Sequence, residues 1–272
     1  MLYFFLTSLF FACSAEAITQ KGQKALDAHD LAGAETHFRK AISKDNRHLP
    51  AVVGLGWTYL LAGEKEGAEK VFDRCLQISA QDPGCLRGRA SVSMRSGAFA
   101  KAQELLNKAM ELYPDNPKVL SSYALLLLNQ GNLGKAEEHY RSLVERLPRQ
   151  AEYRLGLAES RLRQGDSDSA LALVESAIAI KSTPVRTVAM LWALRARSLI
   201  ARSAGLEDSD NCDQTAPPVL AWIKSAEKSA DRAFQTGVEL PDLPALRRQI
   251  LRRRAVVKEL CPATTAATSD DN

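Results

Sequence analysis

The stretch that decides the fold is residues 49–82, LPAVVGLGWTYLLAGEKEGAEKVFDRCLQISAQD. Its apolar residues follow the spacing of an amphipathic helix twice over. They are Val52, Leu55 and Tyr59 in the first half and Val71, Phe72 and Leu76 in the second. Between the halves lies Gly63-Glu64-Lys65-Glu66, where a glycine that tolerates positive φ can end one helix before polar residues turn the chain. The stretch therefore predicts two antiparallel helices joined by a tight turn.

The same pattern recurs with a period of 34 residues, without insertion or deletion. Alanine marks the phase at Ala34, Ala68, Ala102, Ala136 and Ala170. Five residues before each alanine come His29, Gly63, Gly97, Gly131 and Gly165. Twelve before come Gly22, Gly56, Ala90, Ala124 and Ala158, and four after come Phe38, Phe72, Leu106, Tyr140 and Val174. Small and bulky positions in one register predict helices that approach closely at the small residues, with the bulky side chain filling the space beside them. No strand is expected.

The second unit resembles the tetratricopeptide repeat signature at Val52-x-x-Leu55-Gly56-x-x-Tyr59 and Ala68-x-x-x-Phe72, with valine replacing the leading tryptophan and alanine the closing proline. The resemblance implies an all-α, right-handed α-α superhelix of about five helical hairpins. Their phases are 15–48, 49–82, 83–116, 117–150 and 151–184. Polar residues stand where the family usually has apolar ones at Lys21, Arg89, Ser93, Arg154 and Arg161. Units with such residues are expected to be less stable or to face something polar.

The phase decays after residue 184, where Trp192 replaces the glycine or alanine of earlier units. We interpret residues 185–242 as an irregular sixth helical unit, with an exposed polar insertion at 205–218 and a helix from about Val219 to Phe234. Residues 243–262 are predicted to form a basic capping helix, because the last repeat of a solenoid needs a soluble outer face. Residues 263–272 have no core-forming side chains and are expected to be a disordered tail.

The excess positive charge of the chain is concentrated in the capping helix. Residues 243–260 hold Arg247, Arg248, Arg252, Arg253, Arg254 and Lys258 against one acid, Glu259. The apolar stripe Leu246, Ile250 and Val257 can dock this helix on the repeats. Its outer face is then either a solubilising cap or a contact surface for anionic lipid, nucleic acid or another polyanion.

The N-terminus reads as an export segment. Residues 2–12 are an uncharged apolar run that is too short to span a bilayer as a helix. Ala15 and Ala17 supply the small residues that a signal peptidase needs, so residues 1–17 are predicted to be a signal peptide and the mature chain to be periplasmic or secreted. Two alternatives stay open. Phe10-Phe11-Ala12-Cys13 loosely resembles a lipobox, which would make the chain an outer-membrane lipoprotein anchored through Cys13. The segment could also be an N-terminal anchor, or the protein cytosolic.

The cysteine count suits an oxidising compartment, because four of the five cysteines remain after cleavage at Ala17. Cys75 and Cys85 lie at nearly equal distances from the predicted turn between two antiparallel helices. Such a placement can bring their Cα atoms within disulfide reach, which predicts a Cys75–Cys85 bond. A second disulfide, between Cys212 of the polar insertion and Cys261 after the last helix, could then hold the irregular C-terminal end together. The alternative is that Cys75 is a small buried residue and that Cys212 and Cys261 are incidental loop thiols.

Catalytic chemistry is not indicated. The histidines at 29, 37, 48 and 139 have no second ligand or acid at metal-binding or acid–base spacing on the same helix face. Walker, dinucleotide-binding and nucleophile-elbow motifs are missing from the sequence. We therefore expect no enzyme activity, no cofactor and no metal. The expected partner is a protein or peptide, not nucleic acid, with membrane contact only if Cys13 is lipidated.

The family resemblance implies that the first helix of each unit lines a concave groove. The lining would include Val53, Trp57, Leu60, Arg87, Ser91, Arg95, Ser121, Leu125, Leu128, Asn129, Leu155, Glu159, Leu162 and Arg163. Exposed leucine and tryptophan interspersed with arginine are typical of a protein interface, although Trp57 and the leucines could instead be turned inward. We predict an exported, non-enzymatic scaffold that binds a protein segment here, in assembly or organisation of an envelope complex. The alternative is a lipoprotein acting in pilus or secretion-system assembly.

Overall fold

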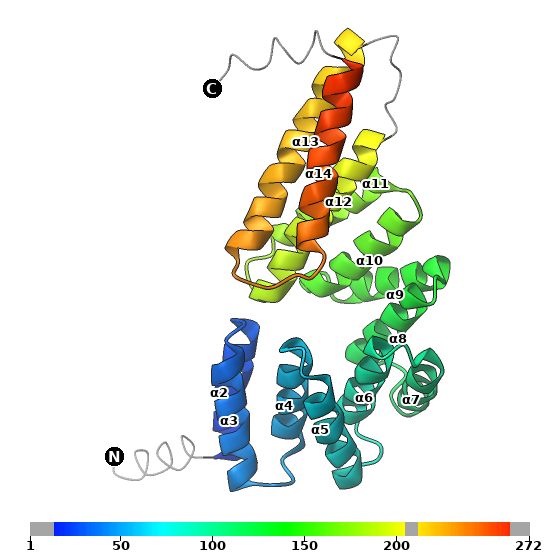
Figure 1. The fold of residues 1–272 in the computed structure, drawn as a ribbon. Coiled ribbons are helices and arrows are strands. Elements are labelled where there is room, and N and C mark those ends of the chain that lie inside the picture. The colour runs from blue at the N-terminus through cyan, green and yellow to red at the C-terminus, as the bar shows by residue number, and fades with distance from the viewer. Residues whose placement is uncertain (1–13, 205–211, 262–272) are drawn as a thin grey trace, which may run out of the picture. The chain divides into compact units, whose positions relative to one another are not determined.

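The computed structural model describes residues 14–204 and 212–261. The described residues form thirteen helices and no strand (Figure 1). They divide into two compact units, residues 1–132 and 133–272, which we call unit 1 and unit 2. None of the helices in the described residues is both long and apolar enough to cross a membrane. The all-α class predicted from the 34-residue period is therefore confirmed.

Unit 1 repeats one hairpin in strict register. Its first helices, the A helices, are α2 (Ala15–Asp27), α4 (Leu49–Leu61), α6 (Pro83–Arg95) and α8 (Pro117–Asn129). Its second helices, the B helices, are α3 (Leu31–Lys44), α5 (Lys65–Ile78) and α7 (Phe99–Leu112). Each A helix has 13 residues and each B helix 14. Every helix packs on the next along the chain, and neighbouring A helices also touch.

The turns between A and B helices have the predicted conformation. Positive φ is found at His29, Gly63, Gly97, Gly131 and Gly165, two residues after each A helix ends. Glycine adopts this conformation without the steric cost that a Cβ brings, which explains why four of the five positions are glycine.

The small and bulky positions meet as the sequence predicts. In unit 1 the buried ring of Phe72 lies against Gly56 of its own hairpin, where an added Cβ would come within 2.6 Å of the ring. The same ring also lies against Gly88 of the following A helix, where a Cβ would overlap it. Phe38 is held in the same way between Gly22 and Gly54. Each aromatic side chain therefore joins two successive A helices.

A disulfide joins Cys75 near the end of α5 to Cys85 at the start of α6, with their Cα atoms 5.5 Å apart. This is the first of the two pairs predicted from the sequence. Both cysteines are fully buried, so the bond fastens two hairpins at their shared core.

Unit 2 begins with regular helices and continues with longer ones. Its helices are α9 (Leu133–Arg146), α10 (Ala151–Arg163), α11 (Ser167–Ile178), α12 (Val185–Ala204), α13 (Cys212–Gln235) and α14 (Leu243–Leu260). Helices α12 to α14 pack on one another around an apolar core that includes Leu199, Ile223 and Ile250 (Figure 1). The tail predicted at 263–272 lies outside the described residues.

The prediction of an exposed polar insertion at 205–218 is wrong for its second half. Residues 205–211 are not described, but residues 212–218 belong to α13, which therefore begins seven residues before the expected Val219. Asp, Asn and two prolines favour a turn in isolation. Here Ala216 and Val219 are buried in the core with α12 and α14, and this packing outweighs the local preference of Pro217 and Pro218 for a turn.

The second predicted disulfide, Cys212–Cys261, stays a prediction, because the Cys212 side chain lies outside the described part of the chain. Cys261 itself is buried and disulfide-bonded.

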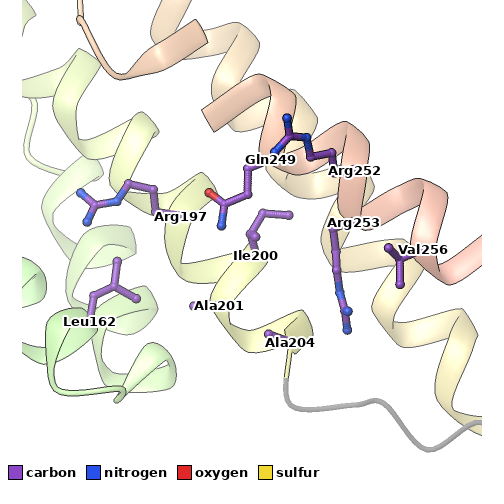
Figure 2. A pocket seen from close by; sticks show the side chains of 9 residues that line it. All are labelled: Leu162, Arg197, Ile200, Ala201, Ala204, Gln249, Arg252, Arg253 and Val256. Carbon is purple, nitrogen blue, oxygen red and sulfur yellow. The ribbon is translucent and has the colours of Figure 1, made fainter. Parts of the chain in front are cut away.

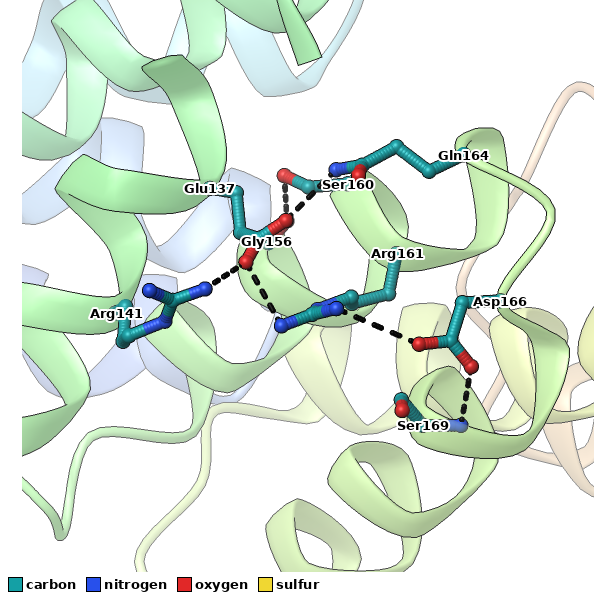
Figure 3. A network of polar contacts seen from close by, with 8 residues as sticks. All are labelled: Glu137, Arg141, Gly156, Ser160, Arg161, Gln164, Asp166 and Ser169. Carbon is teal, nitrogen blue, oxygen red and sulfur yellow. Dashed lines mark hydrogen bonds and ion pairs between the residues drawn. The ribbon is translucent and has the colours of Figure 1, made fainter. Parts of the chain in front are cut away.

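Two arginines at positions that the family usually fills with apolar residues are neutralised inside the fold. In unit 1 Arg89, 6% exposed, lies 2.6 Å from a carboxylate oxygen of Asp73 and 2.5 Å from one of Glu69. In unit 2 Arg161 lies between Glu137, at 2.8 Å, and Asp166, at 3.4 Å (Figure 3). The polar surface that these side chains were expected to face is thus supplied by the chain itself.

Candidate protein-binding surface

The A-helix surface of unit 1 is centred on Trp57. One side of its ring packs edge-to-face on Phe72, with the centroids 5.8 Å apart and the planes at 74°. The Arg87 guanidinium of the next A helix lies 4.8 Å from the Trp57 ring centroid, a cation–π distance. The indole is half-buried, so both interpretations of Trp57 hold in part: it is anchored in the core and still reaches the surface.

A cavity of about 230 Å³ adjoins the A helices of unit 1, and one of about 450 Å³ lies among α10, α12 and α14 of unit 2. The unit 1 cavity lies at the N-terminal ends of α4, α6 and α8. It is lined by Leu49, Pro50, Val53, Asp82, Pro83, Gly84, Arg87, Asn116 and Lys118. Two of the predicted groove residues, Val53 and Arg87, therefore meet at one cavity, and Trp57 lies one helical turn after Val53.

Other predicted residues of unit 1 reach solvent without forming a common site. Arg95 is exposed and donates a hydrogen bond of 2.6 Å to the carbonyl oxygen of Leu60. Leu125 is 43% exposed, and the amide of the exposed Asn129 lies 3.9 Å from the sulfur of Met94. Ser121 is half-buried.

Leu60, Ser91 and Leu128 are not on this surface, so the sequence prediction is wrong at these three positions. Their exposed fractions are 2%, 8% and 2%. Leu60 packs in the apolar cluster that contains Phe72, and the Ser91 hydroxyl donates to the carbonyl oxygen of Arg87 at 3.0 Å. An inner A helix such as α4 touches α2, α3, α5 and α6, and these neighbours leave only a narrow face open.

In unit 2 two of the predicted residues of α10, Glu159 and Arg163, form an ion-pair cluster with Arg197 of α12. Leu155, Glu159 and Leu162 are half-buried and Arg163 is exposed. Glu159 accepts hydrogen bonds from Arg163 at 2.7 Å and from Arg197 of α12 at 2.8 and 3.1 Å. Arg163, one of the predicted groove residues, therefore already has a carboxylate partner within the chain.

The environment of Glu159 lowers its pKa. Partial burial raises this pKa, but the hydrogen bonds and positive charges of Arg197 and Arg163 outweigh burial and bring it below the ordinary value of 4.5. Because the folded-state pKa is the lower one, Glu159 contributes stability that is present above pH 4.5 and is lost as the pH falls through the folded value.

Glu159→Gln is therefore expected to flatten the acid side of the stability profile. The free energy of unfolding of the variant should fall less steeply below pH 4.5 than that of the wild type. Urea unfolding followed by circular dichroism across this range measures the slope. Glu152→Gln, at an exposed position on the same helix, is the control and should keep the wild-type slope. Identical slopes for Glu159→Gln and wild type would contradict the assignment.

The unit 2 cavity lies between α10, α12 and α14 (Figure 2). It is lined by Leu162, Arg197, Ile200, Ala201, Ala204, Gln249, Arg252, Arg253 and Val256. Of these only Leu162 was a predicted groove residue, because the 34-residue phase that located the others ends before α12. The arginine run 252–254 was visible in the sequence, where it indicated either a solubilising cap or a contact surface for a polyanion, but not a cavity shared with α10 and α12.

A metal centre is not formed by the described residues. The one group of potential ligand side chains close enough together, among the residues that the structure describes, is Cys75, Asp82 and Cys85. Its two sulfurs are bonded to each other and cannot act as thiolate ligands.

Comparisons with known proteins agree with this architecture. Tetratricopeptide repeat models match residues 25–91, 93–159 and 151–176. No curated protein matches the chain significantly. Among solved structures, a thermophilic tetratricopeptide repeat protein of Thermus thermophilus is 20% identical, with 70% of this chain and 99% of that chain covered and a TM-score of 0.58. The Cut9–Hcn1 hetero-tetramer of the APC/C is 14% identical, with 90% and 45% covered and a TM-score of 0.62. PilF of Pseudomonas aeruginosa is 16% identical, with 79% and 90% covered and a TM-score of 0.51.

Identities this low show the fold alone. The repeat models, however, cover more than half of the chain, in the register that the A and B helices follow. The chain therefore belongs to the tetratricopeptide repeat family, whose fold is a scaffold for binding proteins or peptides.

Proposed function

We propose that this chain is an exported, non-enzymatic scaffold that binds a segment of another protein on its A-helix surface, in assembly or organisation of a bacterial envelope complex. The observation that carries the proposal is the Trp57–Arg87 pair beside the unit 1 cavity. Tryptophan and arginine are the residue types that most often dominate binding energy at interfaces. The packing of Trp57 on Phe72 holds the indole in place, so little side-chain freedom is lost when a partner binds.

The disulfide supports the export part of the proposal. Disulfides persist in oxidising compartments such as the periplasm and are rare in the reducing cytosol. The Cys75–Cys85 bond lies in the regular part of the repeats and is fully buried. The apolar run at residues 2–12, outside the described residues, supplies the export signal in this proposal.

Arg87→Glu tests the binding surface. Trp57→Ala is less informative, because it also removes packing on Phe72 and so can destabilise the repeat. Arg87→Glu should weaken capture of the envelope partner by at least about tenfold, since it replaces a hot-spot cation by an anion. Lys108→Glu, at an exposed position on a B helix, makes the same change of charge as the control.

The measurement is a pull-down from envelope extracts, followed by titration of the captured protein against both purified variants. A protein retained by wild type and Lys108→Glu but lost with Arg87→Glu would support the proposal. Equal retention by all three would place the binding surface elsewhere. Circular dichroism of each variant checks that the helices are intact.

The lipoprotein alternative is favoured by the start of α2. The Ser14 side chain caps this helix by accepting a hydrogen bond of 3.1 Å from the Ala17 amide, and Glu16 lies 3.5 Å from His48. Cleavage after Ala17 would remove the cap and the first turn, at a cost of about 1 kcal/mol for the cap alone. Cleavage before Cys13 would retain both. Mass spectrometry of the mature N-terminus separates the two, because only a lipoprotein begins at an acylated Cys13 and accumulates as a precursor under globomycin.

A further inference from the structure

We infer that the cavity between α10, α12 and α14 of unit 2 binds a protein segment in which carboxylates flank an aliphatic side chain. The inference rests on the proposed function in taking the occupant to be a protein segment. It adds the chemistry of that segment and a second location for its binding.

The floor of the cavity is aliphatic. Leu162 of α10 is half-buried, Ile200 of α12 is buried, and Val256 of α14 is 39% exposed. Ala201 and Ala204 leave room between these larger side chains, and the cavity volume of about 450 Å³ is enough for an aliphatic side chain and the backbone around it. Covering such a surface removes apolar area from water, which favours binding.

Three guanidinium groups line the same cavity, and none of its nine lining residues is acidic. Arg197 is fixed by its two hydrogen bonds to Glu159. Arg253 extends toward the end of α12, where it donates a 2.5 Å hydrogen bond to the carbonyl oxygen of Ser203 (Figure 2). Glu159 compensates the charge of Arg197, whereas the described residues supply no carboxylate for Arg252, so this guanidinium adds an uncompensated positive charge to the described lining.

Arg252 is the group best placed to receive a ligand. It is exposed, and no ion pair or hydrogen bond engages its side chain among the described residues. A guanidinium binds a carboxylate through two parallel hydrogen bonds, a geometry that lysine cannot reproduce. An acidic residue next to the aliphatic anchor can therefore pair with Arg252 while the anchor covers Val256 and Ile200.

The composition of the cavity favours an acidic protein segment over other anions. Single-stranded nucleic acid is usually held by aromatic side chains on which bases stack, and no lining residue is aromatic. Membrane surfaces are bound by apolar faces that insert into the lipid, whereas Ile200 lies buried at the bottom of a hollow between three helices.

The test is a selection of short random peptides on the full chain, repeated with Arg252→Glu and with Lys258→Glu. Lys258 is the matched control, because it is exposed on α14 two residues after Val256 and so lies on about the opposite side of the helix. Peptides that bind wild type and Lys258→Glu but not Arg252→Glu should be rich in Asp or Glu beside Leu, Ile or Val. In fluorescence anisotropy, a synthetic peptide of this kind should lose at least about tenfold in affinity with Arg252→Glu. The same peptide with Asn and Gln in place of Asp and Glu should bind the wild-type chain with a similarly reduced affinity.

Several results would overturn the inference. They are the absence of Arg252-dependent peptides, Arg252-dependent peptides without acids, equal losses with Lys258→Glu, and preferential Arg252-dependent binding of phosphatidylglycerol vesicles or of a single-stranded oligonucleotide. Peptides that depend on Arg87 but not on Arg252 would overturn this inference and leave the proposed function standing. Peptides that depend on neither arginine would count against both.

Discussion

Gly88→Ala is expected to lower the free energy of unfolding by about 3 kcal/mol, the upper end of the usual cost of overpacking a core. The added methyl group would overlap the ring of Phe72. That ring is fully buried and is also held by Gly56 on its other side, so it cannot move away without displacing a helix. Urea unfolding followed by circular dichroism measures the loss.

Two further variants make this prediction specific. Adding Phe72→Leu to Gly88→Ala should recover part of the stability, and the double-mutant cycle should give a coupling of about 1 kcal/mol or more, as expected of residues in contact. Gly134→Ala is the matched control: it lies inside α9, where an added Cβ meets nothing within 4 Å. Gly134 lies in the first turn of α9 and the added methyl group contacts nothing there, so this change should alter the free energy of unfolding by no more than about 0.5 kcal/mol. Additive effects of Gly88→Ala and Phe72→Leu would show that the overlap is relieved by some other movement.

The pair of substitutions Glu69→Gln and Asp73→Asn is expected to cost about 3 kcal/mol, because it leaves the Arg89 guanidinium buried without a compensating charge. The Arg89 side chain is only 7% exposed, whereas Glu69 and Asp73 are 41% and 50% exposed. The expected loss of stability therefore comes from the buried charge of the arginine and not from the two carboxylates, which solvent can reach.

Arg89→Met should have a much smaller effect, between no change and a gain of about 1 kcal/mol. It removes the buried charge altogether and restores the apolar character that repeats of this family usually have at the position. Thermal and urea unfolding of both variants provide the comparison. If Arg89→Met were as destabilising as Glu69→Gln with Asp73→Asn, the ion pairs would be net stabilising and our ranking would be wrong.

The sequence was sufficient to predict the regular part of the fold. Ala34, Ala68 and their equivalents gave the register, and the positive φ at Gly63 and Gly97 follows from the same alignment. These features depend on contacts within a hairpin or between adjacent hairpins, whose sequence spacing is constant. A period in the sequence therefore carries the information directly.

The candidate surface was less predictable, because exposure depends on how many neighbours an A helix has. Trp57 and Leu60 are three residues apart on α4, yet Trp57 reaches the surface and Leu60 is enclosed. The family resemblance places both residues on the groove lining, but it does not give the width of the face that the four neighbouring helices leave open.

Of the residues that line the unit 2 cavity, the period pointed only to Leu162. The lining residues on α12 and α14, such as Ile200 and Arg252, lie beyond residue 184, where the 34-residue phase has ended. The start of α13 was misjudged for a related reason. The prolines at 217 and 218 suggest a turn locally, and only the burial of Ala216 and Val219 reveals the helix.

The aromatic residues of the B helices also restrict how this array can evolve. Phe38, Phe72 and Tyr140 each face a glycine in the following A helix, at Gly54, Gly88 and Gly156, whereas Leu106 is followed at the equivalent position by Ser122. A deletion that fused the hairpin of Phe72 to the helix of Ser122 would set a phenylalanine where the neighbour has a side chain instead of a hydrogen. Whole hairpins are therefore not interchangeable, and a viable duplication or recombination has to carry each B helix together with the A helix that comes after it.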